Sequence, residues 1–220
     1  MQVRFPFAEA ELPSSLAAFL RDRPNCCGWR EYLKLAAWTL PFERVALLDS
    51  EMQVVSDADG IFDVEVEAEE GAAVEEGREA EGEGPFLATV ATSAPLNGGL
   101  IVLTPSNDTY ARMVRAVLTT PFDLASGWGG AGWGAWGRPF HGCEGPQGFL
   151  HHYFFRGGGG PGSGGRLISK CEWNSNTAWC LGRAVEEVGL LPRCVGGPST
   201  CRSRCMLLTS FVSLPSTSYS

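Results

Sequence analysis

The chain has 220 residues, of which 44% are hydrophobic and 19% charged, and its formal net charge at pH 7 is −8. The hydrophobic content is sufficient for a folded core, so the composition excludes a wholly disordered chain. The negative charge argues against nucleic acid or an anionic membrane as the main partner.

Two helices are predicted in the first forty residues. Residues 14–22 begin with serines that can cap a helix, and residues 29–38 follow a helical pattern. The apolar stripe of this second helix consists of Trp29, Leu33, Ala36 and Ala37. Lys34 lies off that stripe, so the pattern alone predicts an exposed lysine.

A short apolar strand is predicted at Val45–Leu48, and two carboxylates follow it at Asp49 and Glu51. Strand ends are often acidic because the chain returns to solvent there. The alternative is a divalent cation site, because hard cations prefer carboxylate oxygens. The motif alone leaves both interpretations open.

Residues 64–84 consist almost entirely of Glu, Gly and Ala. Like charges repel one another and glycine adds chain entropy, so we expect a solvated, flexible insertion. An acidic binding segment is the alternative.

Residues 95–118 carry the clearest pattern of the chain. Leu100–Leu103 is an apolar strand between glycines and a Thr-Pro pair, and Ser106 can cap the helix that follows. The apolar face of that helix consists of Tyr110, Met113, Val114, Val117 and Leu118. A buried strand followed by an amphipathic helix indicates an α/β layer architecture.

The segment 127–137, "GWGGAGWGAWG", contains the pattern Gly-x-Gly-x-x-Gly. That pattern indicates a dinucleotide site only between a strand and a helix, and neither flank qualifies. We predict a mobile glycine-rich loop. The alternative is that Trp128, Trp133 and Trp136 stack on sugar rings.

The last part of the chain divides at residue 156. Residues 145–155 are compatible with a helix, on whose surface His151 and His152 are expected. Residues 156–165 are rich in glycine, and the remainder shows no periodicity. Five of the eight cysteines lie after residue 170, at spacings that do not match paired zinc motifs.

Four stretches, in order, resemble the glycogenin-type enzymes of glycosyltransferase family 8: "KLAAWTL" (34–40), "FERVALLDSEMQVVSDADGIFD" (42–63), "LNGGLIVLTPSNDTYARM" (96–113) and "GPQGFLHHYF" (145–154). The resemblance implies an α/β domain with a mostly parallel sheet of the nucleotide-diphospho-sugar transferase (GT-A-like) type, incomplete at both ends. This domain would span residues 29–155, with the acidic insertion inside it. Residues 1–28 would be an amino-terminal segment that does not match the family, and residues 156–220 a glycine-rich linker and a poorly ordered, cysteine-rich tail.

The same resemblance implies a function. It predicts transfer of a hexose from a nucleotide diphosphate sugar, with a UDP-sugar as the expected donor, to a carbohydrate or glycoprotein acceptor with retention of configuration. A manganese or magnesium ion would offset the charge of the departing diphosphate. No apolar stretch approaches the roughly 18 residues of a membrane-spanning helix. We therefore expect a cytoplasmic protein, with the Golgi as the alternative if the amino end is incomplete.

The resemblance also assigns the residues of the predicted site. Asp49 and Glu51 would bind the metal, and Gln147 would lie near the reacting sugar as the catalytic residue. The donor would contact Lys34, Asn97, Gly98, Gly99 and Gly148. The alternative for residues 97–99 is a turn that leads into a strand.

Three departures from the family pattern keep other functions open. Glu51 replaces the second aspartate of the metal motif, Pro146 replaces an acid, and the late His-x-x-Gly-x-x-Lys-Pro-Trp stretch is absent. One alternative is a catalytically inactive or truncated relative that binds a nucleotide sugar or a protein. Another is an acidic interaction module, with residues 64–84 as its binding segment.

Overall fold

The computed structural model describes residues 4–22, 28–50, 52, 54, 57–64, 86–91, 93–160, 164–173 and 210–212. Its helices are η1 (Glu9–Glu11), α1 (Ser14–Asp22), η2 (Gly28–Thr39), η3 (Asp59–Phe62), α2 (Asn107–Thr119), η4 (Gly134–Trp136), α3 (Pro146–Phe155) and α4 (Lys170–Trp173), where η marks a 3-10 helix. Its strands are β1 (Val45–Leu48), β2 (Phe86–Thr89), β3 (Asn97–Leu103), β4 (Phe122–Asp123), β5 (Gly127–Trp128), β6 (Gly165–Ile168) and β7 (Ser210–Val212). Glu51 and the acidic insertion, apart from Val64, lie outside the described residues.

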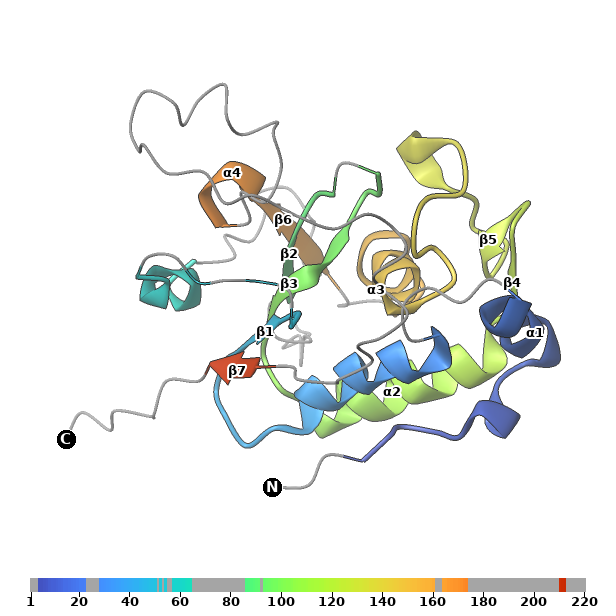
Figure 1. The fold of residues 1–220 in the computed structure, drawn as a ribbon, viewed down its shortest axis with the longest axis horizontal. Coiled ribbons are helices and arrows are strands. Elements are labelled where there is room, and N and C mark those ends of the chain that lie inside the picture. The colour runs from blue at the N-terminus through green and yellow to red at the C-terminus, as the bar shows by residue number, and fades with distance from the viewer. Residues whose placement is uncertain are drawn as a thin grey trace, which may run out of the picture.

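The main sheet has five strands in the order β6-β2-β3-β1-β7, with helices packed against it (Figure 1). The pairs β1–β3, β2–β3 and β1–β7 are antiparallel, and β2–β6 is parallel. Within the described residues the chain combines helices with a mixed, mostly antiparallel sheet, whereas we expected a mostly parallel one. The reason lies partly in residues 90–96, which join β2 to β3 and are too few for the crossover that parallel neighbours require.

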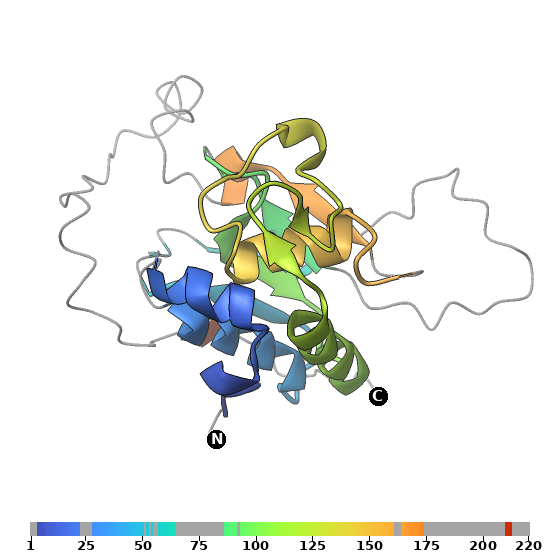
Figure 2. The same ribbon diagram turned by 90° about the vertical axis from the view of Figure 1, so that its right-hand side faces the viewer.

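The local patterns around β1 and β3 predicted these elements well. The strand at 45–48 is confirmed, and the strand expected at 100–103 begins three residues earlier, at Asn97. Ser106 caps α2 as expected, because its Oγ accepts a 3.2 Å hydrogen bond from the N–H of Thr109. Figure 2 shows α2 beside η2, on the side of the molecule that also holds α1.

The helix expected at 29–38 is a 3-10 helix, and its buried face agrees with the predicted stripe only in part. Ala36 and Ala37 are buried as predicted, but Tyr32, Leu35 and Trp38 are buried as well, whereas Leu33 remains partly exposed. A 3-10 helix has three residues per turn, so residues spaced by three share a face. The predicted stripe assumed the 3.6-residue period of an α-helix.

Residues on both sides of the expected domain, 29–155, contribute to its core and to its main sheet. Leu16 and Leu20 of α1 are buried in the same core as η2 and α3. After residue 155, β6 pairs with β2 and β7 pairs with β1, so both lie in the main sheet. These pairings are long-range, and the weak periodicity of the segment gave no sign of them.

The glycine-rich segment 127–137 is folded and not the mobile loop that we predicted. Trp128 and Trp133 are 2% and 9% exposed, so they pack in the core and present little surface for stacking on a sugar. The indole N–H of Trp128 donates a 2.8 Å hydrogen bond to the carbonyl oxygen of Cys143. Several glycines here have positive φ, including Gly127 at 71° and Gly137 at 71°, and they form the tight bends around the indoles.

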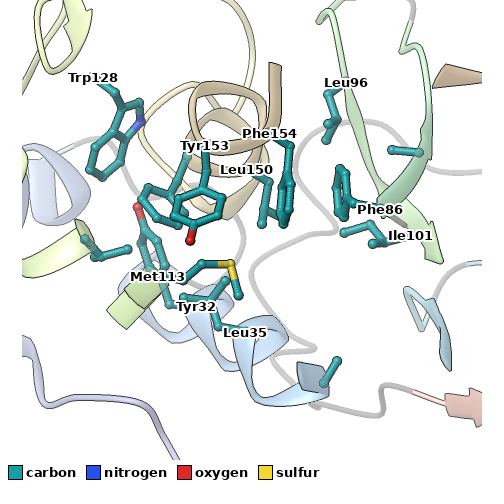
Figure 3. Close-up of a cluster of buried hydrophobic side chains, with 14 of the residues drawn as sticks. Tyr32, Leu35, Phe86, Leu96, Ile101, Met113, Trp128, Leu150, Tyr153 and Phe154 are labelled. Carbon is teal, nitrogen blue, oxygen red and sulfur yellow. The ribbon is translucent and has the colours of Figure 1, made fainter. Parts of the chain in front are cut away.

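Aromatic rings fill the space between the sheet and α3. Phe86 of β2 and Phe154 of α3 are stacked, with ring centroids 4.1 Å apart and an interplanar angle of 6° (Figure 3). Trp38 of η2 stacks on both rings, at 6.0 and 5.9 Å. This cluster holds η2, β2 and α3 in fixed relative positions.

No helix in the described parts of the chain is long and apolar enough to cross a membrane.

The two histidines of α3 are more buried than predicted. His151 and His152 are both partly buried, and His151 stacks on Phe155 with an interplanar angle of 18°. Burial, followed by the nearby charges of Arg156 and His152, lowers the pKa of His151 to about 4. Because this pKa lies well below 7, the imidazole of His151 is neutral at pH 7. The sequence pattern had placed both histidines on the helix surface.

Candidate functional site

Four segments that are distant in the sequence meet where β1 ends and β3 begins. In the antiparallel register Leu48 pairs with Leu100, so Asp49 lies next to Gly99. The N–H of Asp49 donates a 2.9 Å hydrogen bond to the carbonyl oxygen of Gly99. Lys34 arrives from η2 and Gln147 from the first turn of α3. The structure therefore brings together Lys34, Asp49, Asn97, Gly98, Gly99 and Gln147.

Lys34 is the central cation of this cluster. Its Nζ lies 2.7 Å from Oδ1 of Asp49 and donates a 3.1 Å hydrogen bond to the carbonyl oxygen of Gly98. The side chains of Lys34 and Asp49 are only 14% and 28% exposed. The exposed helix lysine expected from the stripe is therefore wrong, because η2 turns this side chain toward the sheet.

Gln147 links α3 to β3. Its Oε1 accepts a 2.9 Å hydrogen bond from the N–H of Gly98, and its Nε2 donates a 2.7 Å hydrogen bond to the carbonyl oxygen of His141. Gly98 is consequently held on both sides of its backbone, by Gln147 at the nitrogen and by Lys34 at the carbonyl. Sequence reasoning did not single out the backbone of His141, because no residue type is needed for a carbonyl acceptor.

Residues 97–99 belong to β3 and do not form a turn before it. The Oδ1 of Asn97 accepts a 2.7 Å hydrogen bond from the N–H of Gly99. A Cβ atom at Gly99 would lie 2.9 Å from that oxygen, closer than ordinary Cβ contacts. A Cβ atom at Gly98 would lie 3.5 Å from the Cβ of Gln147 and 3.6 Å from Nζ of Lys34. The two glycines thus let the surrounding side chains approach the strand closely.

Gly148 has contacts of a different kind from those of the other predicted residues. A Cβ atom there would lie 2.0 Å from the carbonyl oxygen of Cys143. Gly148 is buried, and its N–H donates a 3.0 Å hydrogen bond to the carbonyl oxygen of Gly142. The glycine therefore allows α3 to pack against the preceding loop.

A second group of polar side chains lies buried just before α3. The hydroxyl of Tyr32 donates a 2.9 Å hydrogen bond to the carbonyl oxygen of Glu144. Glu144 itself is only 6% exposed. Burial, together with the charge of Glu144, raises the pKa of the Cys143 thiol to about 12. The thiol therefore stays protonated at neutral pH, which makes it unsuitable as a nucleophile.

The carboxylate of Asp49 is a hard oxygen donor and is partly exposed, so it suits one ligand position of a divalent cation. In the described part of the chain no group of three His, Cys, Asp or Glu side chains could hold a metal ion. Glu51, the second predicted ligand, lies outside the described residues. Any cation at Asp49 must also share the carboxylate with Lys34.

Comparison with protein-family models, with curated proteins and with solved structures finds no match for this chain. The candidate site therefore stands on its geometry and on the four sequence stretches that meet in it.

Proposed function

We propose that this chain binds a nucleotide diphosphate sugar, with a UDP-sugar as donor, and transfers its hexose to a carbohydrate or glycoprotein acceptor. One observation carries the proposal. Four segments bring together Lys34, Asp49, Gly98 and Gln147 at the point where β1 ends and β3 begins. A lysine and a carboxylate at such an edge supply complementary polar contacts for a charged ligand. They come from the stretches that resemble the family.

The proposed roles of the residues follow from their chemistry. The Lys34 ammonium would bind phosphate oxygens, because it is a compact positive charge and its flexible stem lets it reach them. Gly98 and Gly99 would allow the sugar to approach the backbone of β3. Gln147, held by Gly98 and His141, would lie beside the reacting sugar. When bound, a manganese or magnesium ion at Asp49 and Glu51 would supply charge neutralisation for the departing diphosphate.

A second candidate function is nucleotide-sugar binding without catalysis. The observation that favours it is Pro146, the first residue of α3, which stands where the family has an acid. A prolyl ring cannot accept a hydrogen bond or carry charge, so it cannot steady a sugar as a carboxylate can. This protein would bind the donor and release it unchanged.

Calorimetric titration of the full chain with UDP, with and without manganese, tests the proposal. We expect saturable binding that manganese strengthens and that Asp49→Asn weakens. Asp108→Asn is a matched control, because Asp108 pairs with Arg112 on the exposed surface of α2. A folded chain that does not bind UDP under either condition would refute both candidate functions. Binding without hexose release from any UDP-sugar would favour the second.

A further inference from the structure

Glu31 lies one turn before Lys34 in η2. Residues three apart in a 3-10 helix share a face, and one turn rises by about 6 Å. Lys34 uses this face to reach the carbonyl oxygen of Gly98 at the start of β3. Glu31 therefore faces the same way, one turn nearer the amino end of the helix. Sequence reasoning singled out the lysine of this face but not the carboxylate beside it.

Two observations place the Glu31 carboxylate beside the loop before α3. Its Oε2 lies 3.7 Å from the position that a Cβ atom would take at Gly145, the N-cap residue of α3. Burial, followed by the charges of Glu144 and Glu31, raises the pKa of the Tyr32 hydroxyl, which is bonded to the carbonyl oxygen of Glu144. The charge of Glu31 thus acts on the residue just before Gly145, and the lack of a Cβ atom at Gly145 leaves room for the carboxylate.

The same loop carries the carboxamide of Gln147 on its other side. A Cβ atom at Gly142 would lie 3.2 Å from Nε2 of Gln147, and one at Gly145 would lie 3.6 Å from the carbonyl oxygen of Gly142. Gln147 from α3 and Glu31 from η2 therefore border one loop of four residues, 142–145. The proposed function puts the reacting sugar beside Gln147, so Glu31 lies at the sugar end of the site.

We propose that Glu31 accepts hydrogen bonds from hydroxyls of the hexose, and that the site therefore prefers a nucleotide sugar to the bare nucleotide. The inference rests on the proposed function for its ligand. An ionised carboxylate has about four acceptor positions, and its hydrogen bonds are stronger than those between neutral groups. Asp49 is less suited to this role, because its Oδ1 is paired with Lys34 at 2.7 Å.

Lys34 and Glu31 together would orient the donor. The ammonium attracts the diphosphate and the carboxylate repels it, so the phosphates would lie at Lys34 and the sugar at Glu31. Sugar hydroxyls are uncharged hydrogen-bond donors, and they are the part of the ligand that a carboxylate accepts. Removal of the Glu31 charge should therefore cost affinity for the sugar and leave affinity for the diphosphate.

The test is calorimetric titration of the full chain with UDP, UDP-glucose and UDP-galactose, in the buffer in which the original chain binds UDP most tightly. We expect one of the two UDP-sugars to bind at least about tenfold more tightly than UDP, the usual effect of a hydrogen bond to a charged group. In Glu31→Gln this advantage should fall below about threefold while the affinity for UDP stays the same. Glu43→Gln removes the same charge from an exposed residue and should keep the original advantage.

An unchanged advantage of the UDP-sugar in Glu31→Gln would overturn the inference. Equal losses for UDP and the UDP-sugar would overturn it too, because they would mean that Glu31 only holds η2 against α3. If the original chain binds UDP but neither UDP-sugar more tightly, the inference fails and nucleotide binding stands. If UDP does not bind at all, the proposed function fails and the inference fails with it.

A second variant covers the case in which Glu31→Gln does not fold by circular dichroism. Glu31→Asp keeps the charge but withdraws the carboxylate by one methylene. It should lose most of the advantage of the UDP-sugar over UDP, and an unchanged advantage would again overturn the inference.

Discussion

The side-chain oxygen of Gln147 accepts a 2.9 Å hydrogen bond from the backbone N–H of Gly98, and this bond ties the first turn of α3 to the start of β3. The other end of the same carboxamide is bonded to the carbonyl oxygen of His141 at 2.7 Å. Gln147 therefore joins three segments. The carbonyl oxygen of Gly98 in turn accepts a hydrogen bond from Lys34. The geometry of the candidate site depends on this one side chain.

Replacement of Gln147 should therefore weaken both stability and ligand binding. Gln147→Met keeps the length of the side chain but leaves the Gly98 N–H and the His141 carbonyl unpaired. We expect the free energy of unfolding to fall by about 1 kcal/mol, because the partly buried Gly98 N–H loses its acceptor while the exposed His141 carbonyl can bond to water. Gln147→Glu keeps an acceptor for the Gly98 N–H and loses only the donor to the His141 carbonyl. At pH 7 it should therefore lose less stability than Gln147→Met. Urea unfolding measures both variants, and unchanged stability of Gln147→Met would contradict the bridging role.

Gly148 should tolerate no side chain. Gly148→Ala places a Cβ atom 2.0 Å from the carbonyl oxygen of Cys143, a backbone atom that cannot move aside without shifting the loop before α3. We expect a loss of at least about 1–3 kcal/mol, as for overpacked cores. Gly164→Ala is the control, because nothing lies within 4 Å of a Cβ atom there. Thermal unfolding that treats the two variants alike would show that α3 does not pack as described.

The aromatic stack should dominate the stability of the core. Phe154 is 4% exposed and contacts Phe86 and Trp38, so Phe154→Ala should cost about 3–5 kcal/mol. Phe42→Ala, at a residue 38% exposed, should cost much less. Denaturant unfolding monitored by tryptophan fluorescence compares them. Similar losses in both variants would mean that Phe154 is not a core residue.

Acid should destabilise the protein through His151. Its pKa is about 4 in the folded chain against an ordinary value of 6.5, so the unfolded chain binds more protons between these values. The contribution of His151 to stability is therefore present above pH 6.5 and is lost as the pH falls toward 4. His151→Phe should flatten this part of the pH profile, while His152 would retain its own smaller dependence. If His151→Phe has the same dependence of unfolding free energy on pH as the original chain between pH 4 and 7, the lowered pKa of His151 is refuted.

Sequence reasoning predicted elements best where a pattern is local. The helix at 14–22, the strand at 45–48 and the Ser106 cap are confirmed, because a few neighbouring residues decide each of them. Strand β2 was not predicted, because its four residues follow the acidic segment and have no alternation of their own. The tryptophans of 127–137 were misjudged for a similar reason. Glycine content indicated mobility, whereas the indoles gain their stability from distant core partners.

The sequence by itself determined which residues could form a polar site, because residue types at Lys34, Asp49, 97–99 and Gln147 carry that chemistry wherever they lie. Only the tertiary structure decided that these side chains meet. The 3-10 turn of η2 directs Lys34 inward, and the antiparallel register of β1 and β3 puts Asp49 beside Gly99. Both depend on contacts between segments tens of residues apart, and such contacts are set by the packing of the whole core, on which a local pattern carries no information.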